Sequence, residues 1–168
     1  MGGATIIERD GILISELTPA DRAALAFSFA RLGAQSRYQR FMAVKPELTA
    51  AELIRMTAVD HWHHDALIAR SPSPRTPIGV ARYVRCADFE TAEVAVEISD
   101  RWQRQGIGIA LLLALRGRAL GAGIRRFTAT MLADNTGAIG LARSLGRYRV
   151  LSAHGGVLEL VVELTAAA

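Results

Sequence analysis

The stretch 94-VAVEISDRWQRQGIGIALLLALRGRAL-120 decides the fold of this chain. It starts with the apolar pattern of a strand, turns at Gly106 and Gly108, and continues from Ile109 as an apolar helix. The first N–H groups of a helix have no partner within the helix, and the helix dipole adds partial positive charge at that end. A turn cleared by glycines that leads into a helix N-terminus therefore predicts a site for a pyrophosphate.

Three nucleotide-binding patterns compete for this turn. A P-loop needs Gly-Lys-Ser/Thr at its end, and the residues after Gly108 supply neither. A Rossmann fingerprint needs a third glycine, where Leu111 stands, and an acidic residue about 20 positions later, where the chain reads 125-RRF-127. The third pattern, Gln/Arg-x-x-Gly-x-Gly/Ala after a strand, matches at Gln103, Gly106 and Gly108.

This third pattern resembles the acetyl-CoA-binding turn of the GCN5-related N-acetyltransferase (GNAT) superfamily. The context resembles it too: 111-LLLALRGRALGAGIRRFTATML-132 follows, then Asp134-Asn135 and a helix that ends at Leu145-Gly146. The resemblance covers Thr5 to Leu164. It implies an α/β fold: a single domain over 1–168, with a mixed central sheet of about seven strands flanked by helices and the cofactor half at about 92–146.

The resemblance also implies which residues hold acetyl-CoA, the acetyl donor. Backbone groups of Val96 and Ile98 would face the pantetheine arm and the thioester, where N–H groups stabilise developing negative charge. Asn135 matches a family position that hydrogen-bonds the cofactor, and an ordinary helix N-cap explains it equally well. The expected pyrophosphate turn comprises Gln103, Arg104, Gln105, Gly106, Ile107, Gly108, Ile109 and Ala110.

Transfer of an acetyl group to an amine needs a base, because a lysine amine has a pKa of about 10.4 and arrives protonated. Glu93 and Glu97 share one face of the strand by the alternation of side chains. In the resemblance the base of protein-lysine acetyltransferases lies on this strand, so Glu93 is the first candidate and Glu97 the second. The alternative is that both line a wet cleft or pair with arginines. The acid that many family members use, a tyrosine seven residues after the asparagine, is Ala142 here; Tyr148 is out of register, so the acid stays unassigned.

The N-terminal half resembles the acetyltransferase domain of bacterial protein-lysine acetyltransferases, in 17-LTPADRAALAFSFARLGAQSRYQRF-41 and 46-PELTAAELIRMTAVDHWHHDALIA-69. In those proteins the domain is often fused to a regulatory domain, for which 168 residues leave no room. We therefore expect a stand-alone acetyltransferase for protein lysine. The alternatives are an acetyltransferase for a small-molecule amine and a non-catalytic acyl-CoA-binding or sensor domain.

The remaining elements follow from periodicity and turn residues. The segment between about 33 and 48 carries no recognisable pattern, and we expect it to be a loop. We expect strands or a hairpin at 6–17, 65–69, 78–84, 93–98, 126–132, 150–151 and 157–164, and helices from Thr18 to near Gly33, from Thr49 to about Thr57, at 108–121 and at 138–145.

Composition narrows the class of protein. Hydrophobic residues make up 51% and charged residues 21%, which is typical of a globular chain. The apolar run 107–115 is short for a membrane span, no secretion signal is apparent and Cys86 is the only cysteine, so we expect a cytoplasmic protein without membrane contact. The net charge of +4 suits the phosphates of CoA, whereas aromatics at 6% and the lack of a basic run argue against nucleic acid. The spacing of His61, His63 and His64 fits no metal motif, so we expect no metal. A homodimer stays open.

Overall fold

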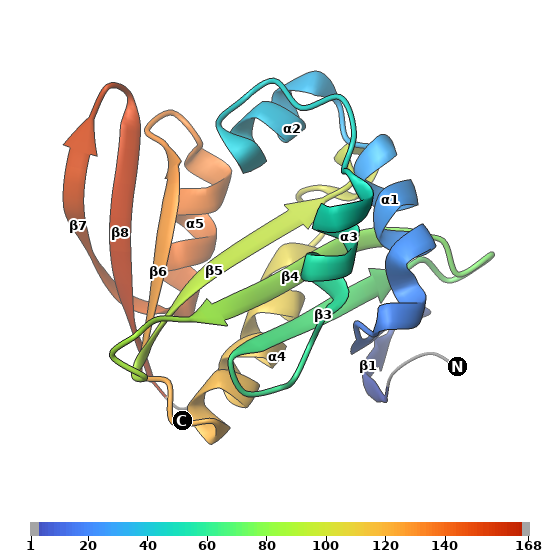
Figure 1. Ribbon diagram of the computed structural model, residues 1–168, viewed down its shortest axis with the longest axis horizontal. Helices are drawn as coiled ribbons and strands as arrows, with labels where there is room; N and C mark the ends of the chain where they lie inside the picture. Colours follow the sequence, from blue (N-terminus) through green and yellow to red (C-terminus); the bar gives the residue numbers. More distant parts are fainter. Residues whose placement is uncertain (1–3, 166–168) are drawn as a thin grey trace.

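The fold is an eight-stranded sheet with helices on both faces, in a computed structural model that describes residues 4–165 (Figure 1). The strand order is β1-β2-β3-β4-β5-β6-β8-β7, and every neighbouring pair is antiparallel except β5 and β6. The strands are β1 (Thr5–Arg9), β2 (Ile12–Glu16), β3 (His64–Arg70), β4 (Pro77–Arg85), β5 (Thr91–Ile98), β6 (Arg126–Leu132), β7 (Gly146–His154) and β8 (Val157–Leu164). The helices are α1 (Arg22–Ala30), α2 (Ala34–Phe41), α3 (Ala50–Thr57), α4 (Ile107–Gly121) and α5 (Thr136–Leu145), with short 3-10 turns η1 (Pro19–Asp21) and η2 (Asp100–Trp102).

Each face of the sheet has its own apolar core. Helices α1, α2 and α3 lie on the face that Figure 1 shows in front, and we call this the front face. The core beneath α1 and α3 includes Leu25, Phe29 and Val80. The core on the other face is larger and packs α4 and α5 against the strands, with Leu111 and Phe127 fully buried. The functional groups discussed below lie where these layers meet the end of β5.

Strand β5 is the centre of the sheet and diverges from β6. On one side, β5 pairs with β4 along its whole length, up to Gly79 opposite Ile98. On the other side, its parallel pairing with β6 ends at Glu93 opposite Thr128. The β6-facing edge of residues 94–98 therefore has no strand partner, and Figure 1 shows the two strands spreading apart. Val96 and Ile98, expected to face the pantetheine arm, lie in this unpaired segment, and their contact with the cofactor stays a prediction.

Two sequence-based expectations need correction. The mixed sheet expected to have about seven strands has eight, and the strand expected at 150–151 is longer, extending over Gly146–His154 as an edge strand. The polar, largely exposed surface of β7 hides this length from an apolar pattern. Residues 34–41, expected to lie in a loop, form α2. This helix buries no residue completely, and mainly Phe41 packs against the front core, so the sequence offers little apolar periodicity from which to predict it.

Candidate active site

The turn between β5 and α4 presents a row of free N–H groups. In the described part of the chain, the N–H of Ala110 is the first of helix α4 to find an acceptor, the carbonyl of Gly106 at 3.0 Å. The six preceding N–H groups, from residue 104 to residue 109, have no acceptor there. Unpaired N–H groups at a helix N-terminus attract an anion, with help from the helix dipole. The turn therefore has the geometry of an anion site, and its contact with a pyrophosphate stays a prediction.

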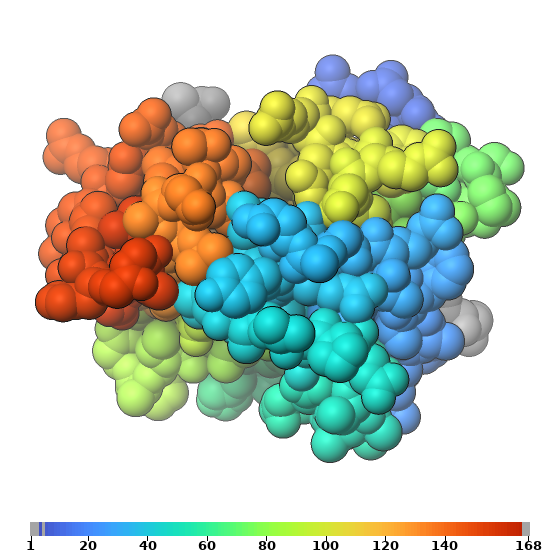
Figure 2. Space-filling model, turned by 90° about the horizontal axis from the view of Figure 1, so that it is seen from above, coloured from blue at the N-terminus to red at the C-terminus, as the bar shows by residue number. Residues whose placement is uncertain are grey.

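Gly106 gives this turn both its shape and its open space. It is the N-cap of α4 and has φ of +81°, a left-handed conformation that side chains other than glycine rarely adopt. No atom lies within 4 Å of the position that a Cβ would occupy. A ligand phosphate can therefore approach the backbone here without meeting a side chain. In Figure 2 the turn (yellow) and the β6–α5 region (orange) stand apart above recessed atoms, with α2 (light blue) in front.

Gln103 and Gln105 brace the turn with their side chains. The Gln103 amide donates to the carbonyl of Ile98 at 3.1 Å and to the hydroxyl of Ser36 at 3.1 Å. The Gln105 amide donates to the carbonyl of Arg101 at 2.9 Å. Arg104 is exposed and has positive φ, which places a free positive charge on the turn. These side chains therefore fix the loop, while its backbone faces the expected ligand.

Helix α2 is tied to the same turn from the front face. The carboxylate of Asp100 accepts from the N–H of Gly33 at 3.1 Å and from the hydroxyl of Ser36 at 2.7 Å. Arg37 donates to three carbonyls, those of Ala30, Leu32 and Pro46, and so links α2 to the residues that precede and follow it. These polar contacts add to the packing of the Phe41 ring against Phe29, at 5.5 Å between ring centroids. The position of α2 thus depends on the end of β5.

The two candidate bases share one face of β5, as expected, and differ sharply in access. Glu93 is exposed and lies at the point where β5 and β6 part. Glu97 is buried under α2, with its Oε2 3.6 Å from Nε of Arg40 and neither oxygen hydrogen-bonded. Burial raises the pKa of the Glu97 carboxyl, and the positive charges of Arg40 and Arg82 oppose that shift. Only Glu93 can meet a proton donor from solvent without a movement of α2.

Arg82 is a positive charge on the front face without a partner. It lies on β4 between Ala66 of β3 and Ala95 of β5, two small residues that leave its guanidinium room. It makes no ion pair or hydrogen bond with any described residue. Burial lowers the pKa of Arg82 to about 10, and the nearby positive charge of Arg40 acts in the same direction. Nothing in the sequence distinguishes Arg82 from the other arginines of this arginine-rich chain, so it was not predicted as a site residue.

Of the remaining predicted residues, some make hydrogen bonds within the protein and others keep groups that could contact the cofactor. Asn135 caps α5, because its Oδ1 accepts from the N–H of Ala138 at 3.0 Å, while its amide nitrogen has no partner in the described residues. The carbonyl of Ile98 already accepts from Gln103, and Val96 lies on the unpaired edge of β5. Ala142 is buried. The hydroxyl of Tyr148 lies 3.4 Å from the guanidinium of Arg143 on α5, so the structure identifies no general acid.

His61 and His63 make contacts with aspartates near them in the chain. Nδ1 of His61 is 2.9 Å from the buried Asp65, which also binds Arg118 of α4. His63 contacts Asp60. Among residues 4–165, no group of three His, Cys, Asp or Glu side chains is arranged to hold a metal ion. Within the same range, no helix is long and apolar enough to cross a membrane.

The open turn and the divergent strands fit an acyl-CoA. A pyrophosphate fits the N–H row from residue 104 to residue 109 and the space over Gly106. An extended pantetheine arm can pair with the free edge of β5, much as an added strand pairs with a sheet edge. The chain's own residues thus supply both contacts that such a donor needs.

Comparisons with known proteins agree with this geometry. The model of the Acetyltransferase (GNAT) family matches residues 34–146. Acetyltransferase Pat from Mycolicibacterium smegmatis (strain ATCC 700084 / mc(2)155) is 35% identical over 102 residues, which are 60% of this chain and 30% of that protein. The chain therefore spans under a third of the length of this relative.

Solved structures show the same fold. The GNAT domain of S. lividans PAT superposes with a TM-score of 0.84 at 30% identity, over 96% of each chain. A cAMP-binding acyltransferase from Mycobacterium smegmatis matches with a TM-score of 0.64 at 26% identity, over 97% of this chain and 47% of that one. The structure of yncA from Salmonella typhimurium with its cofactor acetyl-CoA has a TM-score of 0.71 at 20% identity, over 95% and 97% of the two chains.

Proposed function

Because this chain belongs to the acetyltransferase (GNAT) family and is an acetyl-CoA-dependent enzyme, we propose that it transfers the acetyl group directly to a primary amine, the side chain of a protein lysine. The observation that carries this proposal is the divergence of β5 from β6 at Glu93. It creates an unpaired strand edge for the donor, next to an exposed carboxylate for the acceptor. Direct transfer fits this arrangement, because both partners reach the same point at once.

The turn and the strand edge position the donor. Backbone N–H groups of residues 104–109 hold the pyrophosphate, and the positive charge of Arg104 attracts it. The edge of β5 at Val96 and Ile98 directs the arm toward Glu93, and the amide nitrogen of Asn135 is free to add a hydrogen bond from α5. Acetyl-CoA, when bound, supplies an acetyl group activated as a thioester.

Glu93 serves as the base in this proposal. It accepts a proton from the ammonium of the incoming lysine, directly or through a water, so that the nitrogen lone pair becomes available. The nitrogen then bonds to the acetyl carbon while the carbon–sulfur bond breaks, and sulfur leaves as the thiolate. A thiol has a pKa of about 8.5, so the thiolate can leave without a dedicated acid. The access of Glu93, compared with the sealed Glu97, supports this choice.

The open front face supports a protein acceptor. Glu93 and its cross-strand neighbour Val84 are both exposed, and Val84 retains 43% of its surface. Small substrates are usually enclosed in a concave pocket, whereas a lysine on a protein needs only that its side chain reach the reactive point. The single free cysteine, Cys86, fits a reducing cytoplasm as the place where the enzyme acts.

One observation favours a second candidate, a small acceptor that carries a carboxylate or phosphate beside its amine. Arg82 forms no hydrogen bond or ion pair with a described residue, and Arg40 and Arg55 add positive charge near it, while Glu97 and Glu93 act against that charge. An anionic group on the acceptor would compensate that charge.

Release of thiol from acetyl-CoA, followed with single-lysine peptides, free amino acids and simple amines, separates the two candidates. The lysine proposal predicts the highest kcat/KM for peptides, with little effect of Arg82→Gln. If amino acids give the higher kcat/KM and Arg82→Gln removes that preference, the small-molecule acceptor is correct. Equal, background rates for all amines would contradict both.

A further inference from the structure

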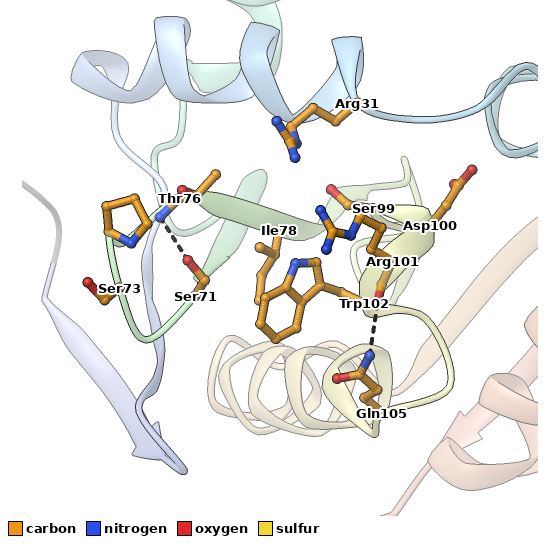
Figure 3. Close-up of a pocket in the computed structure, with 11 residues that line it drawn as sticks. Arg31, Ser71, Ser73, Thr76, Ile78, Ser99, Asp100, Arg101, Trp102 and Gln105 are labelled. Carbon is orange, nitrogen blue, oxygen red and sulfur yellow. Dashed lines mark hydrogen bonds between the residues drawn. The ribbon is translucent and has the colours of Figure 1, made fainter.

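A second concave site lies beside the pyrophosphate turn, on the side away from β6. It is a cavity of about 470 Å³ between the end of α1, the loop that joins β3 to β4, and η2 (Figure 3). This volume lies within the range of sites for small molecules. Gln105 is the one residue that its lining shares with the expected pyrophosphate turn, and no residue of the unpaired β5 edge lines it.

Two arginines from distant parts of the chain point into this cavity. Arg31 ends α1, and Arg101 belongs to η2, and Figure 3 shows both guanidinium groups turned toward the interior. Neither makes an ion pair or a side-chain hydrogen bond with a described residue. The guanidinium carbon of Arg31 lies over the ring of Phe27, 5.2 Å from its centroid. The one carboxylate in the wall, Asp100, is already engaged by Gly33 and Ser36.

The wall between the two arginines holds an unsatisfied hydroxyl. Ser99 is only 5% exposed, and its Oγ has no hydrogen-bond partner among the described residues. In Figure 3 it lies between the two guanidinium groups. A buried hydroxyl without a partner is costly, which is the usual mark of a group that a ligand or water satisfies. A second observation, independent of the arginines, thus points to a ligand.

The floor of the cavity is flat and apolar. It is formed by the indole of Trp102, with the fully buried Ile78 behind it (Figure 3). Hydroxyl groups of Ser73 and Thr76 line the opposite rim. An aromatic face below two positive charges is suited to a molecule with a ring at one end and an anion at the other.

We propose that this cavity binds a small phosphate monoester carried on a flat ring, separately from acetyl-CoA. The phosphate accepts hydrogen bonds from Arg31, Arg101 and the hydroxyl of Ser99, and the ring packs on Trp102. A monoester carries three strong acceptor oxygens and close to two negative charges at neutral pH, so it can engage both guanidinium groups and the hydroxyl at once, which the two oxygens of a carboxylate cannot.

Trp102 provides a direct optical test. The chain has two tryptophans, so Trp62→Phe leaves Trp102 as the single reporter. Phenyl phosphate is titrated into this protein in the presence of saturating acetyl-CoA, with excitation at the red edge of the indole absorption. We expect a saturable change in fluorescence, and weaker binding for phenol and for inorganic phosphate, each of which has half of the required chemistry.

Matched variants identify the site. Arg31→Gln and Arg101→Gln should each weaken phenyl phosphate at least tenfold, because each removes a charged hydrogen bond. Arg22→Gln, an equal loss of charge at the other end of α1 and outside the cavity, should leave the affinity unchanged. Thermal unfolding of each variant verifies that it folds.

Three results would overturn the proposal: a linear, non-saturable response, an equal affinity in the Arg31→Gln/Arg101→Gln double variant, or displacement by acetyl-CoA, seen as weaker binding of phenyl phosphate with saturating acetyl-CoA than without it. Displacement would show that the cavity is the outer part of the donor site, occupied by the 3′-phosphate and adenosine of CoA.

Discussion

Gly106→Glu separates the backbone strain of the turn from its contact with the donor. At φ of +81° any residue with a side chain costs about 1–2 kcal/mol of folding stability. The Cβ of the new side chain meets no protein atom, because nothing lies within 4 Å of it. It would instead place a negative charge where we expect the pyrophosphate. We expect the affinity for acetyl-CoA to fall at least tenfold, which is about 1.4 kcal/mol.

Gly123→Glu is the matched control. Gly123 has φ of +84°, equally open surroundings, and a position just beyond the other end of α4. Both variants should lose a similar free energy of unfolding, measured by denaturant, while calorimetry should show weakened acetyl-CoA binding for Gly106→Glu alone. If Gly106→Glu binds acetyl-CoA as the wild type does, or if both variants lose affinity equally, the assignment of the turn is wrong.

Three further predictions concern catalysis, electrostatics and stability. Glu93→Gln should lower kcat about 10²- to 10⁴-fold with little change in acetyl-CoA affinity, and the loss should shrink as the pH approaches the pKa of the amine. An intact rate in Glu93→Gln would show that the base is another group. Glu97→Gln should instead lower the free energy of unfolding by about 3 kcal/mol, because it leaves the Arg40 guanidinium without its counter-charge. Rising salt should weaken acetyl-CoA more than a pantetheine fragment without phosphates, since screening acts on charge, and an equal response would exclude an electrostatic role for Arg104. The hydrogen bond from Lys45, together with the N–H of Thr49, lowers the pKa of Glu52 from 4.5 to about 2. The contribution of ionised Glu52 to folding stability is therefore complete above pH 4.5 and is lost as the pH falls through 2. The difference in Tm between the wild type and Glu52→Gln should shrink over that window, and a constant difference would contradict this prediction.

The sequence predicted the helices and strands that have a strong apolar periodicity or clear capping and turn residues at their ends. The β5–turn–α4 unit follows from an apolar strand, two glycines and an apolar helix, and the structure places all of them as expected. Helix α3 follows from its capping box, in which Thr49 and Glu52 satisfy each other's backbone N–H groups. These signals are local, so they can be read without knowing what the segment packs against.

Helix α2 and its consequences could not be predicted in this way. Its hold on the fold comes from Asp100, 67 residues from Gly33 and 64 from Ser36. Because α2 covers Glu97 and leaves Glu93 open, the alternation along β5 alone could not distinguish the two carboxylates. The cavity that Arg31 and Arg101 share has the same origin, since it forms only when residues 70 positions apart meet.

Acetyl transfer to protein lysine through Glu93 is tested most directly by isotope labelling. A mixture of host proteins and small-molecule amines is incubated with acetyl-CoA that carries a heavy acetyl group, using the wild type, Glu93→Gln or no enzyme, and both fractions are analysed by mass spectrometry. We expect heavy acetyl-lysine on proteins with the wild type, and at least a hundredfold less with Glu93→Gln at equal acetyl-CoA occupancy. Label confined to small amines, or protein labelling that is equal in the wild type and Glu93→Gln, would contradict it.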